Sequence, residues 1–164
     1  MDWDNYFINT AQFISLKSKD PSTKIGCIIV DKYNVPLISG FNGFAMGVND
    51  KCIDVPERYD RPAKYAFTVH AEASAVGIAA RTGRTLYDST FYMNYWPGCC
   101  ASCAGLLIDA GIKRIIVPDR PIPSTTDVNN WRNTISIANQ MFLEAGVSIT
   151  IIPNFNFIVP LSLP

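Results

Sequence analysis

The stretch Trp96-Pro-Gly-Cys-Cys-Ala-Ser-Cys103 holds three of this chain's five cysteines. It follows a predicted strand, Thr90–Tyr95, and runs into the first turn of a predicted helix, Ala101–Ala110, that Gly111 ends. Residues three apart in the first turn of a helix face the same side, so Cys100 and Cys103 can bind one metal ion. A helix N-terminus also favours the thiolate form of cysteine. This strand-to-helix junction predicts an α/β fold that carries either a metal-binding pair or a redox dithiol.

A second predicted helix opens at the chain's one histidine, in His70-Ala71-Glu72, and Gly83 ends it. One histidine and two cysteines make three zinc ligands and leave the fourth position open, as in catalytic zinc sites. Residues two apart on a continuous helix point to different faces. Glu72 can therefore reach the same site only if His70 lies at the helix start, before the backbone is fully helical. A thiol exchanger would not need this His-Ala-Glu segment, so a zinc site is the favoured reading.

The rest of the chain alternates between strand and helix patterns. An amphipathic helix is expected over Asp2–Lys19, where Tyr6 and Phe13 widen a buried stripe formed by Trp3, Phe7, Ala11 and Ile14. Further expected elements are strands over Ile25–Val30, Val35–Phe41, Ile112–Val117 and Val147–Ile152, and a helix that Asp127 caps and Gly146 ends. Residues 42–66 lack a period and are expected to be irregular.

This order predicts a three-layer α/β/α sandwich with a mixed five-stranded sheet. The two later connections each contain a helix, so at least the strands they join are expected to be parallel. We expect a single domain over residues 1–164, with a core of 1–152. The apolar tail, 153–164, is expected to pack on a neighbouring subunit.

Composition and charge exclude several classes of function. Lys plus Arg equals Asp plus Glu at 14 each, so a large nucleic-acid footprint is not expected. No apolar stretch is long enough to cross a bilayer, and the acidic N-terminus does not read as a secretory signal. An odd number of clustered cysteines suits a reducing compartment. We therefore expect a cytoplasmic protein without a nucleic-acid or membrane partner.

A His-x-Glu segment followed by Cys-x-x-Cys is the signature of zinc-dependent nucleobase deaminases. The likeness extends to Asp20-Pro-Ser-Thr-Lys-Ile-Gly26, Ser39-Gly-Phe-Asn-Gly43, Val69-His-Ala-Glu72, and Cys103 with Ala110-Gly-Ile112. With these motifs in order over about residues 1–152, the chain resembles the deoxycytidylate (dCMP) deaminase family. The resemblance implies a cytidine-deaminase-like fold and Zn²⁺ as cofactor.

One departure from the family pattern concerns Cys99. The family has proline immediately before its first ligand cysteine, whereas here Pro97 is followed by Gly98 and Cys99. Counting back from Gly111 makes Cys103 the second ligand, and the usual gap selects Cys100 as the first. Cys99 is then a packed thiol near the site. A Cys99/Cys103 pair stays open as an alternative, because residues four apart also share a helix face.

The resemblance implies hydrolytic deamination of dCMP to dUMP and ammonia, which feeds thymidylate synthesis. Zinc would bind through His70, Cys100 and Cys103 and activate a water, and Glu72 would move protons to N3 and to the leaving amine. The implied substrate-binding residues are Asn42 for the sugar and base, the Ala71 backbone N–H for pyrimidine O2, and Ser22, Lys24 and Arg120 for the 5′-phosphate. Asn42 could instead serve a turn with Gly43, and Ser22 and Lys24 could be solvated loop residues.

Other functions stay open beside this one. The chain could act on dCTP, a free nucleoside or a base in RNA, or it could be a non-catalytic zinc module that binds nucleotides or proteins. The resemblance also implies a homo-oligomer, commonly a hexamer, activated by dCTP with Mg²⁺ and inhibited by dTTP. Gly43, Asp50 and Lys51 are the candidate residues for such an effector site.

Overall fold

The computed structural model of the chain describes residues 1–95, 98–119 and 128–158, with only the backbone described for 128–130. Five strands form one sheet. Their order across the sheet is β2 (Pro36–Phe41), β1 (Gly26–Val30), β5 (Ser89–Met93), β6 (Ile112–Pro118) and β7 (Ser148–Ile152). The β1 strand pairs antiparallel with β2 and β5, whereas β5/β6 and β6/β7 are parallel. The sheet is therefore mixed, and the last three strands along the chain, β5, β6 and β7, are parallel to one another, as predicted.

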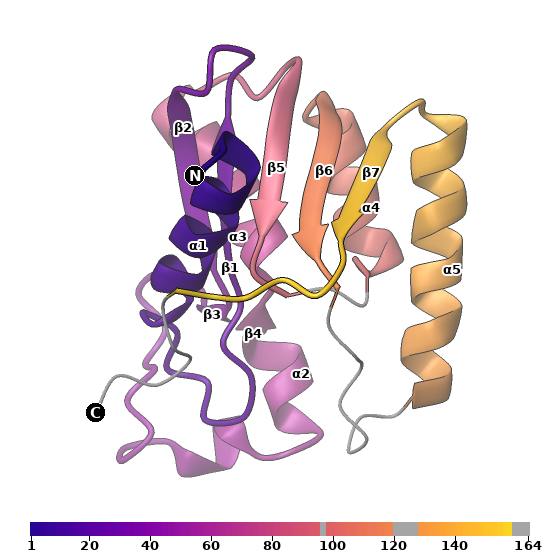
Figure 1. Cartoon of the computed structure of the whole chain (residues 1–164). Coiled ribbons are helices and arrows are strands. Elements are labelled where there is room, and N and C mark those ends of the chain that lie inside the picture. Colours follow the sequence, from indigo (N-terminus) through magenta and orange to yellow (C-terminus); the bar gives the residue numbers. More distant parts are fainter. Residues whose placement is uncertain (96–97, 120–127, 159–164) are drawn as a thin grey trace.

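Helices cover both faces of the sheet, which gives the predicted three layers (Figure 1). On one face lies α1 (Trp3–Ser15), packed through Phe7, Ile8 and Ala11. On the other lie α3 (Ala71–Thr82), α4 (Ala101–Asp109) and α5 (Val128–Glu144). Among the described parts of the chain, no helix is both long and apolar enough to span a bilayer.

The small side chains of α3 bring this helix close to the sheet, as predicted. Ala71, Ala75 and Ala79 are buried in the larger of the two core clusters, together with residues of β1, β5 and β6. Gly83 ends the helix in the left-handed region, with φ of 66°. Close packing of α3 fixes where its N-terminus, and therefore His70, lies relative to the sheet.

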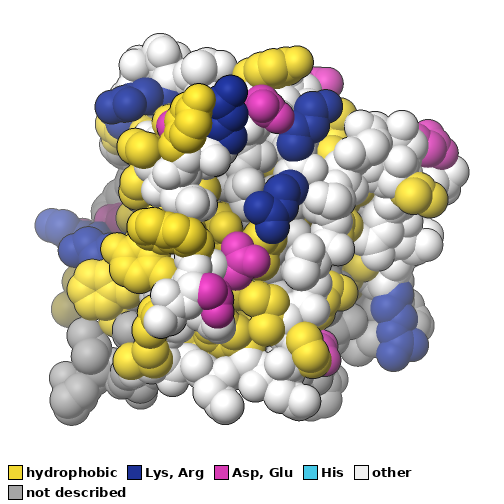
Figure 2. Space-filling view, turned by 45° about the horizontal axis from the view of Figure 1, so that its top comes forward, with side chains coloured by type: hydrophobic (Ala, Val, Ile, Leu, Met, Phe, Trp, Pro, Cys, Tyr) yellow, Lys and Arg dark blue, Asp and Glu magenta, His cyan; other side chains and the backbone are white. Residues whose placement is uncertain are grey.

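The first helix is shorter than expected and buries a narrower face. It ends at Ser15 rather than Lys19, because Leu16 and Lys17 already donate to the carbonyls of Phe13 and Ile14, three residues back. Trp3, Tyr6 and Phe13 are 56%, 49% and 61% exposed, so the prediction that they belong to the buried stripe is wrong. Figure 2 shows one face of the molecule, on which hydrophobic side chains are interspersed with charged ones.

The segment 42–66, expected to be irregular, contains short elements. β3 (Gly43–Phe44) pairs antiparallel with β4 (Thr68–Val69), and between them lie a 3₁₀ turn, η1 (Pro56–Tyr59), and α2 (Ala63–Phe67). These elements lie beyond one end of the main sheet, beside β1 (Figure 1). Their length of two to five residues is too short for a period to show in the sequence.

The described part of the C-terminal tail packs within its own chain. Phe155 and Phe157 contact the cluster formed by α1 and the sheet, and the Ile158 N–H donates to Asn9 Oδ1 at 2.8 Å. Packing of residues 153–164 on a neighbouring subunit stays a prediction beside this contact with α1. The predicted cap at Asp127 lies outside the described residues.

Candidate active site

His70, Cys100 and Cys103 meet where the N-termini of two helices converge. His70 is the N-cap of α3 with an extended backbone (φ −67°, ψ 155°), and Cys100 is the N-cap of α4. His70 Nδ1 lies 3.5 Å from the Sγ atoms of both Cys100 and Cys103. The structure thus brings together the three residues predicted as ligands, with His70 at the helix start as the sequence required.

The donor set and its spacing fit a zinc ion. Zinc at its usual bond lengths, in tetrahedral geometry, places a nitrogen and a sulfur ligand about 3.6 Å apart. Without a metal, the two thiols share one negative charge: the hydrogen bond from the Cys103 thiol lowers the pKa of Cys100, and the same contact, with burial, raises the pKa of Cys103. A bound cation would favour thiolate at both positions. Three protein donors leave a fourth position for water, as catalytic zinc sites do.

Cys99 lies on the other side of this cluster. Its thiol is 1% exposed and its Sγ falls into a second group, with Glu72 and Cys103. In this arrangement Cys100, rather than Cys99, contacts His70. The geometry therefore favours the Cys100/Cys103 pair over the Cys99/Cys103 alternative, and it makes Cys99 a packed neighbour of the site.

Glu72 is a buried carboxylic acid at the wall of the pocket. Only 5% of it is exposed, and burial raises the pKa of its carboxyl above the ordinary value. Its carboxylate lies within 4.8 Å of the thiols of Cys99 and Cys103. A carboxyl group whose pKa is raised towards neutrality can both accept and donate a proton, which suits a proton shuttle.

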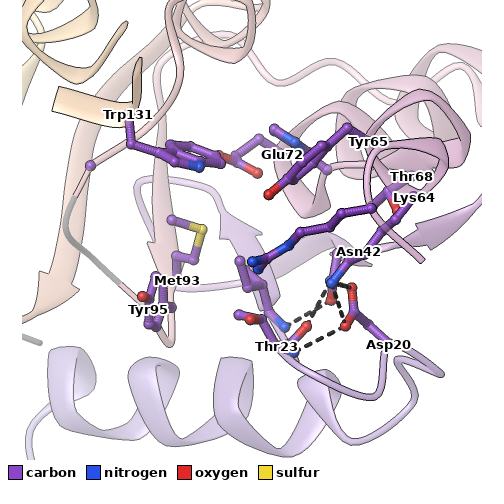
Figure 3. Close-up of a pocket in the computed structure, with 14 residues that line it drawn as sticks. Asp20, Thr23, Asn42, Lys64, Tyr65, Thr68, Glu72, Met93, Tyr95 and Trp131 are labelled. Atoms are coloured by element: carbon purple, nitrogen blue, oxygen red, sulfur yellow. Dashed lines mark hydrogen bonds and ion pairs between the residues drawn. The ribbon is translucent and has the colours of Figure 1, made fainter. Parts of the chain in front are cut away.

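One pocket joins the metal-binding group to a polar end (Figure 3). In Figure 3, Trp131, Glu72 and Tyr65 lie at one end of it, and Asp20, Thr23 and Asn42 lie at the other with their hydrogen bonds. The full lining is Asp20, Thr23, Ile25, Asn42, Arg61, Lys64, Tyr65, Thr68, His70, Glu72, Met93, Tyr95, Gly98 and Trp131. An apolar wall at one end and charged groups at the other suit a ligand with a ring and an anionic tail.

Two of the residues predicted to bind phosphate do not line this pocket. The Lys24 ammonium donates to the Ser18 carbonyl, and the Ser22 hydroxyl donates to Asp20 Oδ1 at 3.0 Å. Arg120 lies outside the described residues. Pro21 turns the chain so that Asp20 and Thr23 face the pocket, while Ser22 and Lys24 serve the loop's own hydrogen bonds. The phosphate-binding role of Ser22 and Lys24 therefore stays a prediction.

Asn42 lines the pocket and Ala71 directly follows His70, while their substrate-binding roles stay predictions. Asn42 is buried and lines the pocket, and its amide accepts from the Ile25 N–H at 2.8 Å and donates to the Thr23 carbonyl at 2.9 Å. Ala71 is the buried first residue of α3, directly after His70. Its N–H belongs to the first turn, where backbone donors have no partner within the helix.

Sequence reasoning missed the cations and the tryptophan of the pocket. Arg61 and Lys64 come from the segment before α2 and from α2 itself, and Trp131 comes from α5. The only signal in the sequence was that two basic residues and Tyr65 stand five to nine positions before His70. The segment was expected to be irregular, so nothing assigned these side chains to the site.

The candidate effector residues lie in the outer part of the 43–69 segment. Gly43 begins β3. Asp50 forms an exposed ion pair with Lys19 at 2.8 Å, and its carbonyl accepts from the Tyr59 hydroxyl. Lys51 is exposed. The effector role of Gly43, Asp50 and Lys51 stays a prediction.

A buried ion pair holds α2 against the loop after α1. Lys64 Nζ lies 2.8 Å from Asp20, and the two side chains are 10% and 5% exposed. Burial by itself would raise the pKa of Asp20, but hydrogen bonds from Lys64 and from the Ser22 and Thr23 N–H groups outweigh it and lower the pKa. The pair therefore ties the 43–69 segment to the pocket.

We expect Asp20→Asn to lower the free energy of unfolding by about 3 kcal/mol at pH 7, because Lys64 is then buried without its partner. The folded pKa of Asp20 lies below the unfolded value of about 3.9, so this stability is present above that pH and is lost as the pH falls through the folded value. The free energy of unfolding, measured with urea, should therefore fall less between pH 7 and pH 3 for Asp20→Asn than for the wild type.

The matched control is Asp50→Asn, which breaks the exposed pair with Lys19. An exposed pair contributes at most about 1 kcal/mol, so this variant should unfold close to the wild type. Equal destabilisation by the two variants at pH 7 would contradict the role given to the buried pair.

Comparison with known proteins relates this chain to nucleotide deaminases. A family model for the cytidine and deoxycytidylate deaminase zinc-binding region matches residues 1–118. An uncharacterized deaminase from the luxG 3′ region of Aliivibrio fischeri is 33% identical over 152 residues, which cover 92% of this chain and 94% of that protein. Human deoxycytidylate deaminase is 30% identical over 150 residues, which cover 90% of this chain and 78% of that protein.

Solved structures show the same fold. The dCMP deaminase of the cyanophage S-TIM5, determined in complex with dCMP and dUMP, matches with a TM-score of 0.67 at 21% identity, over 90% of this chain and 94% of that one. This chain spans 53% and 59% of the length of two proteins named probable deoxycytidylate deaminase, from Caenorhabditis elegans and Drosophila melanogaster, and 64% of the mouse deoxycytidylate deaminase.

Proposed function

This chain belongs to the cytidine and deoxycytidylate deaminase family, and we propose that it converts dCMP and water to dUMP and ammonia, a reaction that feeds thymidylate synthesis. The observation that carries the proposal is the position of Glu72. It is a buried acid that lines the same pocket as His70 and lies within 4.8 Å of Cys103. A site that only bound zinc for structural reasons would not need such an acid.

Each residue of the site then has a chemical task. His70, Cys100 and Cys103 would hold the zinc ion, which, when bound, lowers the pKa of water and so supplies a nucleophile at neutral pH. Glu72 would accept one proton from the attacking water and deliver it to N3 as the C4–O bond forms. It would then accept the proton of the new C4 hydroxyl and deliver it to the amine, so that the C4–N bond breaks, ammonia leaves and the C4 carbonyl forms. The raised pKa of Glu72 favours both transfers.

The pocket can orient a pyrimidine ring over this group. Trp131, Met93 and Tyr95 supply a largely apolar wall, while the Asn42 amide lies towards the polar end. We assign the Ala71 N–H to pyrimidine O2 and Asn42 to the sugar hydroxyl, as the family resemblance implies. Burial of Asn42 and its hydrogen bonds to Ile25 and Thr23 hold it in one orientation for that task.

We assign the 5′-phosphate to the end of the pocket that carries Arg61 and Lys64. Arg61 lines the pocket with its guanidinium 5.7 Å from the centre of the Tyr65 ring. Lys64 is paired with Asp20, and Arg61 adds a second cationic side chain to the lining of the pocket. A guanidinium can bind two phosphate oxygens at once, which a solvated lysine does less well.

Arg61→Ala should raise the KM for dCMP about 10-fold to 100-fold, because a charge-assisted hydrogen bond contributes about 1.5–3 kcal/mol. It should leave kcat within a few-fold and leave turnover of deoxycytidine, which has no phosphate, unchanged. Steady-state rates with both substrates provide the measurement. Arg58→Ala is the matched control, since Arg58 stacks on Phe67 and does not line the pocket. An equal rise in KM for the nucleoside would contradict the assignment.

The product assay across dCMP, dCTP and deoxycytidine tests the proposed function itself. We expect zinc-loaded protein to release dUMP and ammonia in equal amounts from dCMP. Preference for dCTP or deoxycytidine would favour those alternatives, and the balanced charge of the chain argues against a base in RNA. A zinc-loaded protein inert towards all three substrates would support the non-catalytic module instead.

The regulation and assembly that the family resemblance implies stay predictions. They comprise a homohexamer, activation by dCTP with Mg²⁺, inhibition by dTTP, and an effector site that includes Gly43, Asp50 and Lys51. Saturation curves for dCMP with and without each nucleotide would test the effectors, and curves that neither nucleotide alters would exclude them.

A further inference from the structure

One side of α5 faces the cysteine-bearing end of the pocket through Trp131, Thr134 and Ile135. Residues at these spacings lie on one face of a helix, about one turn apart. Trp131 contacts His70, Thr134 contacts Ala101 and Ile135 lies against Gly98, so α5 touches one predicted ligand and the backbone on both sides of Cys99 and Cys100. α5 lies beyond residues 1–118, the part that the family model matches. In Figure 3 Trp131 closes the pocket at the end where Glu72 lies.

Trp131 stacks on the imidazole of His70. The ring centroids are 6.0 Å apart and the planes differ by 22°. His70 turns Nδ1 towards both thiols, so any rotation of the ring moves that nitrogen away from at least one of them. An imidazole that donates to a cation becomes electron-poor, and the electron-rich face of an indole attracts it. The stack therefore favours the one ring orientation that can bind metal.

Thr134 fixes the opening of α4. Its Oγ1 accepts from the Ala101 N–H at 2.9 Å, one residue after Cys100. That N–H is among the first-turn donors that have no partner within the helix. With Ala101 held against α5, the N-cap position of Cys100 is fixed, and the Cys103 N–H lies 3.5 Å from Cys100 Sγ.

Ile135 covers the backbone that leads into the cysteines. Gly98 has φ of 142°, and a Cβ built on it would lie 2.4 Å from Ile135 Cγ2. No side chain other than hydrogen fits there without a shift of α5 or of this turn. The segment before Cys99 and Cys100 is thus in direct contact with α5.

We propose that Trp131 and Thr134 are positioning residues, which keep His70 and Cys100 in the geometry that binds zinc. The proposal rests on the zinc site of the proposed function, but it concerns retention of the metal rather than the reaction. Residues that orient metal ligands change metal affinity about 10-fold to 100-fold when they are lost. α5 would then be needed for a stable zinc site, even though it supplies no ligand.

The test measures the rate at which purified, zinc-loaded protein gives up its metal to the chromogenic chelator 4-(2-pyridylazo)resorcinol. We expect Trp131→Ala and Thr134→Val to release zinc about 10-fold to 100-fold faster than the wild type. Trp131→Phe keeps an aromatic face and Thr134→Ser keeps the hydroxyl, so both should restore slow release. In the cobalt-substituted protein, the visible spectrum should broaden or weaken for Trp131→Ala and stay unchanged for Trp131→Phe.

Two controls separate positioning from general stability. Asn133→Ala changes an exposed residue in the same turn of α5 and should not alter release. Phe142→Leu disturbs the buried end of α5, so it should lower the melting temperature without speeding zinc release. If Trp131→Ala and Thr134→Val fold and release zinc at the wild-type rate, or if Phe142→Leu speeds release as much, the positioning role is wrong while the proposed function stands. A wild-type protein that binds no zinc would overturn both.

Discussion

Replacing Glu72 with glutamine is expected to lower the rate of dUMP formation by about 1,000-fold or more while zinc stays bound. Glutamine fills the same buried space but cannot accept the proton from water or deliver one to N3 and the amine. General acid–base catalysis contributes about 100-fold to 10,000-fold per group, and here one group serves several transfers. Ammonia release under saturating dCMP, with the metal content of the same sample, provides the measurement.

The control for this variant is Glu57→Gln, which changes an exposed acid in η1. It should retain wild-type turnover. A Glu72→Gln protein that still turns over dCMP within 10-fold of the wild type, with zinc bound, would remove Glu72 from the chemistry. Loss of zinc from Glu72→Gln would instead mean that the carboxylate serves the metal, against the three-ligand site.

The second large effect is expected from a pair of neighbouring thiols. Cys100→Ala should lose zinc and with it all measurable deamination, because Cys100 Sγ is one of the two sulfurs 3.5 Å from His70 Nδ1. Cys99→Ala should keep about one zinc per chain, since Cys99 contacts Glu72 and Cys103 rather than His70. Both variants remove one sulfur at adjacent positions, so each serves as the control for the other.

The measurement is zinc per chain after gel filtration, by mass spectrometry of the metal, beside the rate with dCMP. Zinc retained by Cys100→Ala and lost from Cys99→Ala would show that the pair is Cys99/Cys103. A fall in activity of Cys99→Ala with full zinc would point to its contact with Glu72 instead. Measurements on the Cys99→Ala and Cys100→Ala variants alone distinguish these outcomes.

The three residues of the metal-binding group could be predicted from the sequence, because the position of each one at the start of a helix depends on local structure. His70 and Cys100 each cap a helix, and a Cys-x-x-Cys pair in a first turn presents both sulfurs together wherever the helix lies. Long elements with a clear period were also predictable, as α3 and its end at Gly83 show. Only the meeting of the two helix starts depends on the fold, and the family resemblance supplied that.

The substrate end of the pocket could not be predicted in the same way. The sequence could not show, for instance, that the Lys24 ammonium donates to the Ser18 carbonyl of its own loop. Arg61 reaches the pocket only because short elements between residues 43 and 69 fold back beside the main sheet. Trp131 comes from α5, 59 residues after Glu72 in the sequence. The positions of such side chains depend on tertiary packing, which cannot be predicted from a local sequence pattern.

X-ray absorption at the zinc K-edge tests the account most directly, on wild-type protein without substrate. The three-residue group predicts a zinc shell of one imidazole nitrogen and two sulfurs from the protein, completed by one oxygen from water. A shell of three sulfurs, or of four protein atoms with no oxygen, would leave no position for the attacking water and would contradict the proposed reaction.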